Sequence, residues 1–295
     1  MRDIRELSSR LVITILPEVM KACIPASTAH VAVEEEQMNC KKLVVVGDKF
    51  NEFANGKDVL TISQLELLTQ IPANIIDKEH EIIIGQGVRK DFAGKVISNQ
   101  ARNADHGNKL KMCSLKKLVN DKKNAHCHKR HEQNVLIGSA EQTEHNRDLF
   151  AMPLLIDERC EIMADHQTGQ HIQGMLLVEA SRQAFIAVTE EFIYKQETGR
   201  YYVINNMAIN FSSFLFPLPA LVHFEYLEKD VNDRRGRFKA QVRVTQHQTL
   251  CATMDVSFTV YPSGLISEKE KLLAETAMQA AIAAQQSVTP GVMHA

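Results

Sequence analysis

A carboxylate, a guanidinium and an amide recur at helical spacing inside an otherwise apolar stretch of this 295-residue chain. The stretch runs from Met175 to Val188, and the three polar side chains belong to Glu179, Arg182 and Gln183. Residues at i, i+3 and i+4 share one stripe of an α-helix, so these groups face the same way. Because buried charges must be paired or used for chemistry, the stripe indicates either a structural ion pair or an acid–base site.

Two histidines precede this helix and widen the chemistry that it could perform. His166 and His171 lie on the entering loop, and Asp165 stands beside His166. A histidine close to a buried carboxylate is a candidate for proton transfer. We therefore predict Glu179, His166 and His171 as catalytic residues. The competing interpretation is that Glu179 only neutralises Arg182.

The first turn of the helix offers a second kind of chemistry. Its amides lack intrahelical partners and favour negative charge, so they could stabilise an oxyanion. A glycine at position 174 would let a substrate approach the backbone closely. We expect substrate contacts from six residues: Asp165, Gln173, Gly174, Met175, Arg182 and Gln183. The motif contains no cysteine and the chain no Gly-x-Ser-x-Gly, which disfavours a covalent acyl-enzyme.

The elements around this helix predict an antiparallel sheet. Phe238–Val244 and Ala252–Val260 alternate between apolar and polar residues, as in a sheet with one buried and one wet face. We expect the helix over residues 174–194 and a terminal helix over residues 266–287. The expected strands are residues 149–156, 161–165, 201–212, 220–229, 236–246 and 249–262.

Residues 41–115 show a different pattern. Short apolar runs end in glycine and precede helical stretches, which predicts three or four buried parallel strands. Ser63 is a plausible N-cap for a helix over residues 64–70. Gly85-x-Gly87 lacks the third glycine of a dinucleotide fingerprint, so a strand-to-helix turn is favoured over nucleotide binding.

At the helix motif the chain resembles a known family. Gln170–Ala184 is similar to the D-H-V-P-G-M-L-L-L-E-A-A-R-Q-A signature of the A-factor biosynthesis (AfsA-like) hotdog proteins. His128-Lys129, followed by Asn134–Ile137, resembles the start of the same unit, so the similarity covers about residues 127–262. Gln170 and Gln173 depart from the Asp and Pro of the family. One repeat is recognisable, where the family usually carries two.

The resemblance implies an α+β protein, in which a hotdog fold, a long central helix wrapped by an antiparallel sheet, follows a small α/β domain. The expected organisation is an N-terminal helical segment (1–40), the α/β domain (41–115), a basic linker (116–130), the hotdog domain (131–263) and a C-terminal helix and tail (264–295). A single hotdog leaves one sheet edge and half of the substrate tunnel unbuilt, so we expect a homodimer.

The resemblance also implies a substrate class: acyl thioesters carried by an acyl carrier protein or coenzyme A. The expected reaction is transfer of a 3-oxoacyl group to a small hydroxylated acceptor such as dihydroxyacetone phosphate, in the biosynthesis of butyrolactone or butenolide signals or other secondary metabolites. Two alternatives stay open. The protein could hydrolyse or dehydrate acyl thioesters, or it could be a non-catalytic acyl-binding scaffold.

Composition excludes several other classes. A formal net charge of −2 gives no global reason for binding nucleic acid or a membrane surface. The six cysteines show no CxxC spacing, which is typical of reduced thiols in a cytoplasmic protein. We expect no cofactor and no metal, because His126, His128 and His131 match no standard zinc spacing. The lysines around them form either a solvated linker or a docking patch for an acidic carrier protein.

Overall fold

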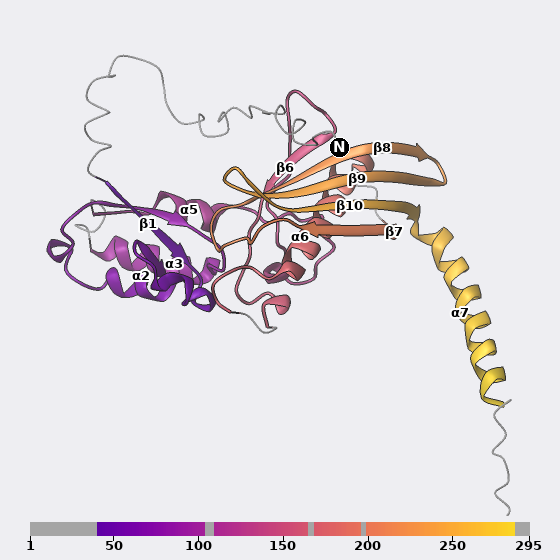
Figure 1. The fold of residues 1–295 in the computed structure, drawn as a ribbon, viewed down its shortest axis with the longest axis horizontal. Coiled ribbons are helices and arrows are strands. Elements are labelled where there is room, and N and C mark those ends of the chain that lie inside the picture. Colours follow the sequence, from indigo (N-terminus) through magenta and orange to yellow (C-terminus); the bar gives the residue numbers. More distant parts are fainter. Residues whose placement is uncertain (1–39, 104–108, 165–167, 196–198, 287–295) are drawn as a thin grey trace, which may run out of the picture. The chain divides into compact units, whose positions relative to one another are not determined.

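The computed structural model describes residues 40–103, 109–164, 168–195 and 199–286 (Figure 1). The helical segment expected before residue 40 lies outside these residues. From Lys41 onward the chain forms one compact unit. It consists of an α/β region, residues 41–120, and a C-terminal domain, residues 131–263, followed by a long helix.

The α/β region is built on a four-stranded parallel sheet in the order β2-β1-β3-β4, as its glycine-terminated apolar runs predict. The strands are β1 (Lys41–Val46), β2 (Val59–Thr61), β3 (His80–Ile84) and β4 (Leu110–Lys111), and the helices are α2 (Ile62–Leu68), α3 (Lys90–Arg102) and α5 (Cys113–Asn120). Helix α2 begins two residues earlier than expected. Thr61, not Ser63, is its N-cap, and it forms a reciprocal capping box with Gln64.

The basic segment 116–130 is not a linker throughout. Its first five residues complete helix α5, whose Leu115 is fully buried and whose Leu118 and Val119 pack against the core of the α/β region. Three apolar side chains at helical spacing thus hold the beginning of the segment against the parallel sheet.

Strand β1 is buried on both faces, which explains its unbroken apolar run. Leu43 and Val45 belong to the core of the α/β region. Val46 belongs to the core of the C-terminal domain, against which Val44 also packs. Since side chains alternate along a strand, one strand contributes to both hydrophobic cores and joins them.

Gly85 and Gln86 fix the junction between the two parts. The buried Gln86 side chain donates to the carbonyls of Leu154 (3.0 Å) and Leu218 (3.2 Å) and accepts from the Ile156 amide (2.9 Å). A Cβ on Gly85 would lie 2.1 Å from the Pro217 carbonyl oxygen. The Gly85-x-Gly87 backbone is therefore packed against other parts of the protein. This agrees with the prediction of a strand-to-helix turn in place of a phosphate-binding loop.

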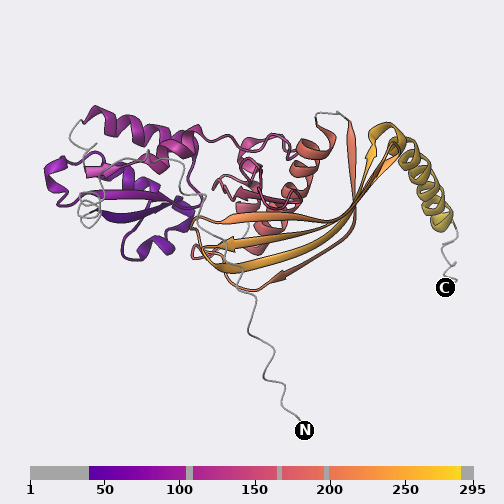
Figure 2. The same cartoon turned by 90° about the horizontal axis from the view of Figure 1, so that it is seen from above.

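The C-terminal domain wraps a six-stranded antiparallel sheet around one helix (Figure 2). Helix α6 (Gly174–Val188) continues as one stretch of π-helix, η6 (Thr189–Tyr194). The strand order is β5-β6-β8-β9-β10-β7, with β5 (Glu141–Gln142), β6 (Leu149–Pro153), β7 (Arg200–Phe211), β8 (Leu221–Asn232), β9 (Arg235–Gln246) and β10 (Thr249–Pro262). The four long strands match the predicted ranges to within three residues.

The strand expected over residues 161–165 is wrong. Glu161–Ala164 is a 3-10 helix, η5, entered by a turn in which the Cys160 amide donates to the Asp157 carbonyl. The apolar residues Ile162 and Met163 are adjacent rather than alternating, which is the pattern of a tight turn and not of a half-buried strand.

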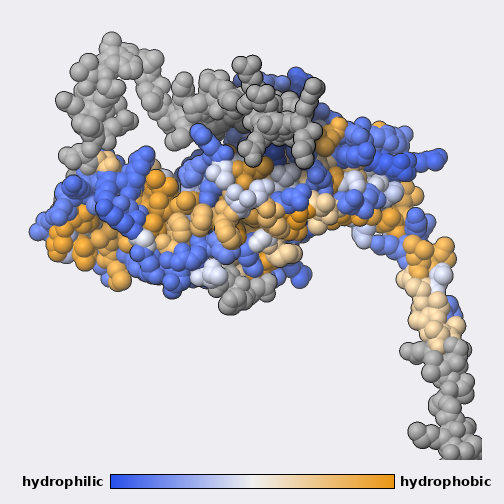
Figure 3. All heavy atoms as spheres, viewed as in Figure 1, coloured by the Kyte–Doolittle hydropathy of each residue, from blue (hydrophilic) through white to orange (hydrophobic). Residues whose placement is uncertain are grey.

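The terminal helix α7 (Ser263–Gln286) is exposed along almost its whole described length, and apolar side chains lie on its surface (Figure 3). Within the described ranges, no helix combines the length and apolar character needed to cross a membrane.

Candidate functional site

The polar stripe of helix α6 is positioned by the apolar remainder of the helix. Leu176, Leu177, Ala180 and Ala184 are buried against the sheet, so the stripe of Glu179 lies on a different face. A single helix thus anchors itself in the core and presents three polar groups at its margin.

Glu179 is the centre of a charged network. Arg182 donates to both of its carboxylate oxygens (2.8 and 2.9 Å), and Lys129 (2.7 Å) and Gln183 (2.9 Å) donate to Oε1. Burial alone would raise the pKa of Glu179. The hydrogen bonds from Arg182, Lys129 and Gln183 outweigh burial and lower the pKa to about 2. Glu179 is therefore an anion at any physiological pH and a weak base.

The Gln183 side chain forms its hydrogen bonds with other groups of the protein. Besides the bond to Glu179, its amide nitrogen donates to the Asn134 carbonyl (2.8 Å), and its oxygen accepts from the Leu136 amide (2.7 Å). The side chain is fully buried. These bonds join Gln183 to Glu179 and to the segment 134–136, and its predicted substrate contact stays a prediction.

Arg182 keeps more capacity than Gln183. Two of its five N–H donors go to Glu179, and its side chain retains 28% exposure. The Glu179 partner raises the pKa of Arg182 further, so the guanidinium stays charged. An anionic group reaching this side chain would meet a fixed cation with donors to spare.

His128 and Lys129 belong to the site although the sequence reasoning did not select them. Lys129 binds Glu179, and the neighbouring His128 Nε2 lies 3.1 Å from Glu190 Oε1 on η6. The His128 ring also meets Tyr202 edge-on at 5.6 Å. The sequence signal for both residues is the His-Lys pair at the start of the region that resembles the family.

The predicted residues at the start of α6 occupy a half-exposed surface. The ring of His171 packs against Phe214, with centroids 4.8 Å apart, and its Nδ1 lies 3.3 Å from the Thr168 hydroxyl. Gln173 donates to the Ile162 carbonyl and does not cap the helix with its side chain. Met175 is 59% exposed.

Gly174 does not leave the open backbone that its sequence position suggested. A Cβ there would lie 2.9 Å from the ring of Phe211, so this side chain covers the glycine. Gly174 is small because an aromatic ring of strand β7 packs on it. A substrate can approach this backbone only if the Phe211 ring turns aside.

The structure does not bring all predicted residues together. Asp165 and His166 lie outside the described residues. Between His171 and Glu179, the described contacts include no hydrogen bond or ion pair. The catalytic roles of Glu179, His166 and His171 stay predictions.

Strand β7 adds an apolar surface beside the start of α6. Its residues Ile204, Met207 and Ile209 stand opposite Phe258, Val256 and Met254 of β10, all buried in the core. Opposed residues share a face of the sheet, so these side chains, with Phe211, face the side of α6. Ile204, Met207 and Phe211 are nevertheless 41%, 38% and 54% exposed. The apolar strip is long enough to accept an aliphatic chain.

Within the described ranges, no three His, Cys, Asp or Glu side chains are grouped as a metal site. The buried thiol of Cys127 lies near this network, and burial raises its pKa to about 12. A thiol in that state is protonated at neutral pH and is a poor nucleophile or ligand.

Comparisons with known proteins gave one family model and a set of similar solved structures. The family model described as the A-factor biosynthesis hotdog domain matches residues 116–262. Solved structures similar to this chain include a conserved protein from Pseudomonas aeruginosa (14% identity, TM-score 0.29, covering 38% of this chain and 81% of that one). A thioesterase from Haemophilus influenzae (14%, 0.30, 42% and 79%) and a thioesterase superfamily member from Thermus thermophilus (12%, 0.30, 37% and 77%) are also similar. The search of curated proteins gave no match.

Proposed function

We propose that the protein transfers a 3-oxoacyl group from a thioester to a small hydroxylated acceptor that carries a phosphate, such as dihydroxyacetone phosphate. Residues 116–262 form an A-factor biosynthesis hotdog domain, and the proposal starts from this family. The observations that carry this proposal are the Glu179 network with its two cations and the apolar strip of β7, whose Phe211 packs on Gly174 at the start of the same helix. Hydrolysis of the thioester needs no cation beside the acyl chain. Binding of an anionic acceptor does need one.

The acyl chain would lie along the strip formed by Ile204, Met207 and Phe211. Its thioester carbonyl would then face the start of α6, where the helix dipole and the first amides stabilise an oxyanion. The acceptor hydroxyl oxygen attacks the carbonyl carbon, the carbon–sulfur bond breaks, and the leaving thiolate takes up a proton. The carrier, an acyl carrier protein or coenzyme A, leaves as the free thiol.

His171 is the better proton acceptor for the acceptor hydroxyl among the described candidates. Its Nδ1 is used by Thr168, and the described contacts give its Nε2 no partner. Glu179, whose pKa is about 2, instead holds Arg182 and Lys129 in place as an anion. Arg182 then offers its remaining N–H donors to the negative charge of the acceptor.

This proposal is tested by following products. The full-length protein is incubated with a 3-oxoacyl-pantetheine thioester, with and without dihydroxyacetone phosphate, and products are identified by mass spectrometry. We expect an ester only when the acceptor is present, and a loss of roughly 10- to 100-fold in transfer rate for Arg182→Ala, because about 1.4–3 kcal/mol of anion binding is removed. Lys195→Ala, an exposed cation at the end of η6, is the matched control and should keep the rate.

Three outcomes contradict acyl transfer. Free acid released equally with and without acceptor, in wild type and Arg182→Ala, would identify a thioesterase. An unsaturated acyl product would identify a dehydratase. No turnover, with the thioester bound intact, would identify an acyl-binding scaffold.

We also propose that two copies associate through strand β7. This strand is an edge of the sheet and pairs with β10 alone among the described strands. Four of its apolar or aromatic side chains are at least 38% exposed: Tyr201, Ile204, Met207 and Phe211. Antiparallel pairing of two β7 strands would satisfy the edge and cover the apolar strip from the partner's side.

Light scattering after size exclusion tests the dimer. Wild type should be a dimer at micromolar concentration. Met207→Glu places a charge in the paired strip and should weaken association at least about tenfold. Ile75→Glu alters an isoleucine of the α/β region that is 61% exposed and should leave the dimer intact. A monomeric wild type, or a dimer unaffected by Met207→Glu, would exclude this interface.

A further inference from the structure

A surface cavity lies beside Lys129. It has a volume of about 510 Å³ and is lined by Lys90 at the start of α3, by residues 119–125 at the end of α5 and just after it, and by Lys129, Arg130, Glu132 and Val135. Lys129 is shared, since it lines this cavity while its Nζ binds Glu179 Oε1. The cavity therefore adjoins the α6 site through one side chain.

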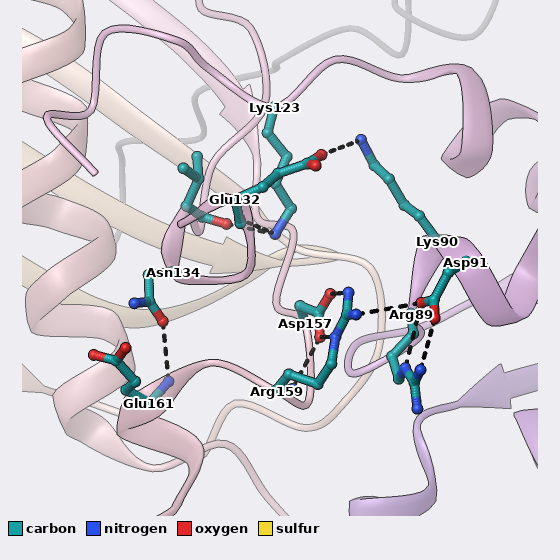
Figure 4. Close-up of polar contacts among 10 residues, drawn as sticks. Arg89, Lys90, Asp91, Lys123, Glu132, Asn134, Asp157, Arg159 and Glu161 are labelled. Atoms are coloured by element: carbon teal, nitrogen blue, oxygen red, sulfur yellow. Dashed lines mark hydrogen bonds and ion pairs between the residues drawn. The ribbon is translucent and has the colours of Figure 1, made fainter. Parts of the chain in front are cut away.

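Positive charge dominates the cavity wall. Two carboxylates line it, those of Asp121 and Glu132, together with five cations: Lys90, Lys122, Lys123, Lys129 and Arg130. Lys90 pairs with Glu132 at 3.0 Å (Figure 4), and Lys129 pairs with Glu179 outside the cavity. The wall then retains an excess of two positive charges, which matches the charge of one phosphomonoester at neutral pH.

Lys123 is the most unusual donor of the wall. Among the described contacts its ammonium binds no carboxylate. It donates instead to the backbone carbonyls of Glu132 (3.1 Å; Figure 4) and Val135 (2.7 Å). Burial lowers its pKa to about 8, although the charges of Asp157 and Glu132 oppose the shift. One of its three N–H donors is left over. A largely buried cation whose hydrogen bonds go to backbone carbonyls, and not to a carboxylate, favours an anion beside it.

Lys122 and Arg130 also line the cavity. Both side chains are exposed, and the described contacts give neither of them a carboxylate partner. An anion bound between them and Lys123 would receive charge-assisted hydrogen bonds from a lysine on each side and from a guanidinium, whose planar fork fits phosphate oxygens.

We propose that this cavity binds the phosphate group of the acyl acceptor, with Lys122, Lys123 and Arg130 as donors. The inference deepens the proposed function, because it places the phosphate of the acceptor in the cavity beside Lys129. The hydroxyl end of the same small molecule then points toward Glu179, Arg182 and the start of α6. A phosphomonoester is favoured over the phosphodiester of a pantetheine arm, which carries one negative charge and not two.

Isothermal titration calorimetry on the full-length protein tests the site without any thioester. The probes are inorganic phosphate, glycerol 3-phosphate and dephospho-coenzyme A, which lacks a phosphomonoester, each in 150 mM salt at pH 7. We expect both monoester-type probes to bind, and Lys122→Gln/Arg130→Gln to weaken their binding at least tenfold. Lys116→Gln/Lys117→Gln removes two exposed cations from neighbouring α5, outside the cavity wall, and should bind as wild type does.

Each other outcome overturns the site. Equal losses in both double variants would mean general charge attraction, and absence of phosphate binding would mean no site. Binding of dephospho-coenzyme A but not of glycerol 3-phosphate would assign the cavity to the thioester carrier. The two proposals fail separately: transfer without phosphate binding removes the cavity alone, and phosphate binding without transfer removes the proposed reaction alone.

Discussion

Glu179→Gln should lower both the stability and the activity of the protein. The carboxylate is 14% exposed and holds Arg182, Lys129 and Gln183, so the neutral amide leaves two cations without their shared anion. A depression of the pKa from 4.5 to about 2 corresponds to roughly 3 kcal/mol. Solvent that reaches the site screens part of this, so we expect a loss of roughly 2 kcal/mol at pH 7.

The loss of stability in Glu179→Gln should depend on pH. Because the folded-state pKa is depressed, the stabilisation is complete above pH 4.5 and is lost as the pH falls toward 2. The gap between wild type and Glu179→Gln, measured by urea unfolding, should therefore shrink by more than half between pH 7 and pH 3. Glu161→Gln, at an exposed position of η5, should show no gap at either pH.

Activity separates the two interpretations of Glu179. If the anion positions Arg182 and Lys129 at the reacting groups, turnover per folded molecule should fall by roughly 100-fold in Glu179→Gln. If the variant unfolds early and keeps its turnover per folded molecule, Glu179 is a structural ion pair and the proposed site lies elsewhere.

Gly85→Ala should strongly destabilise the protein. The new Cβ would lie 2.1 Å from the Pro217 carbonyl oxygen and 2.9 Å from Val46 Cγ1. Backbone on one side and a buried core on the other prevent either neighbour from moving away. Relief would require breaking the hydrogen bond from the Gln86 amide to Pro217 (3.0 Å). We expect a loss of about 3–5 kcal/mol in the free energy of unfolding.

Gly94→Ala is the matched control. Gly94 lies in α3 with no atom within 4 Å of an added Cβ, so alanine should stabilise the helix by roughly 0.5–1 kcal/mol. Circular dichroism during urea unfolding measures both variants. If the free energy of unfolding of Gly85→Ala lies within 1 kcal/mol of the wild-type value, the backbone at this junction can move apart to accept a Cβ.

Much of the fold was readable because its patterns are local. The alternation in Phe238–Val244 and Ala252–Val260 predicts strands that the structure places in β9 and β10. The stop at Gly85 marks the end of β3, and the apolar run after Gly174 gives α6. Periodicity could not show that β1 contributes to two cores, because an unbroken apolar run states only that both faces are covered.

The site was less readable, for a physical reason. Helical spacing brings Glu179, Arg182 and Gln183 together, and the structure shows all three in contact. Lys129 joins them from fifty residues away, and only the folded chain reveals a pair of that separation. The covering of Gly174 by Phe211 is equally non-local, so the sequence could give the glycine but not the ring that requires it.

The side chain of Gln86 has a consequence for how the protein is made. Its partners are Leu154, Ile156 and Leu218, and strand β1 shares a core with β10. A ribosome adds roughly 5–20 residues per second. The α/β region therefore emerges several seconds before the segments that bury Gln86, Val44 and Val46. During that interval its sheet shows an apolar surface to the cell, and a chaperone that covers it should raise the yield of folded protein.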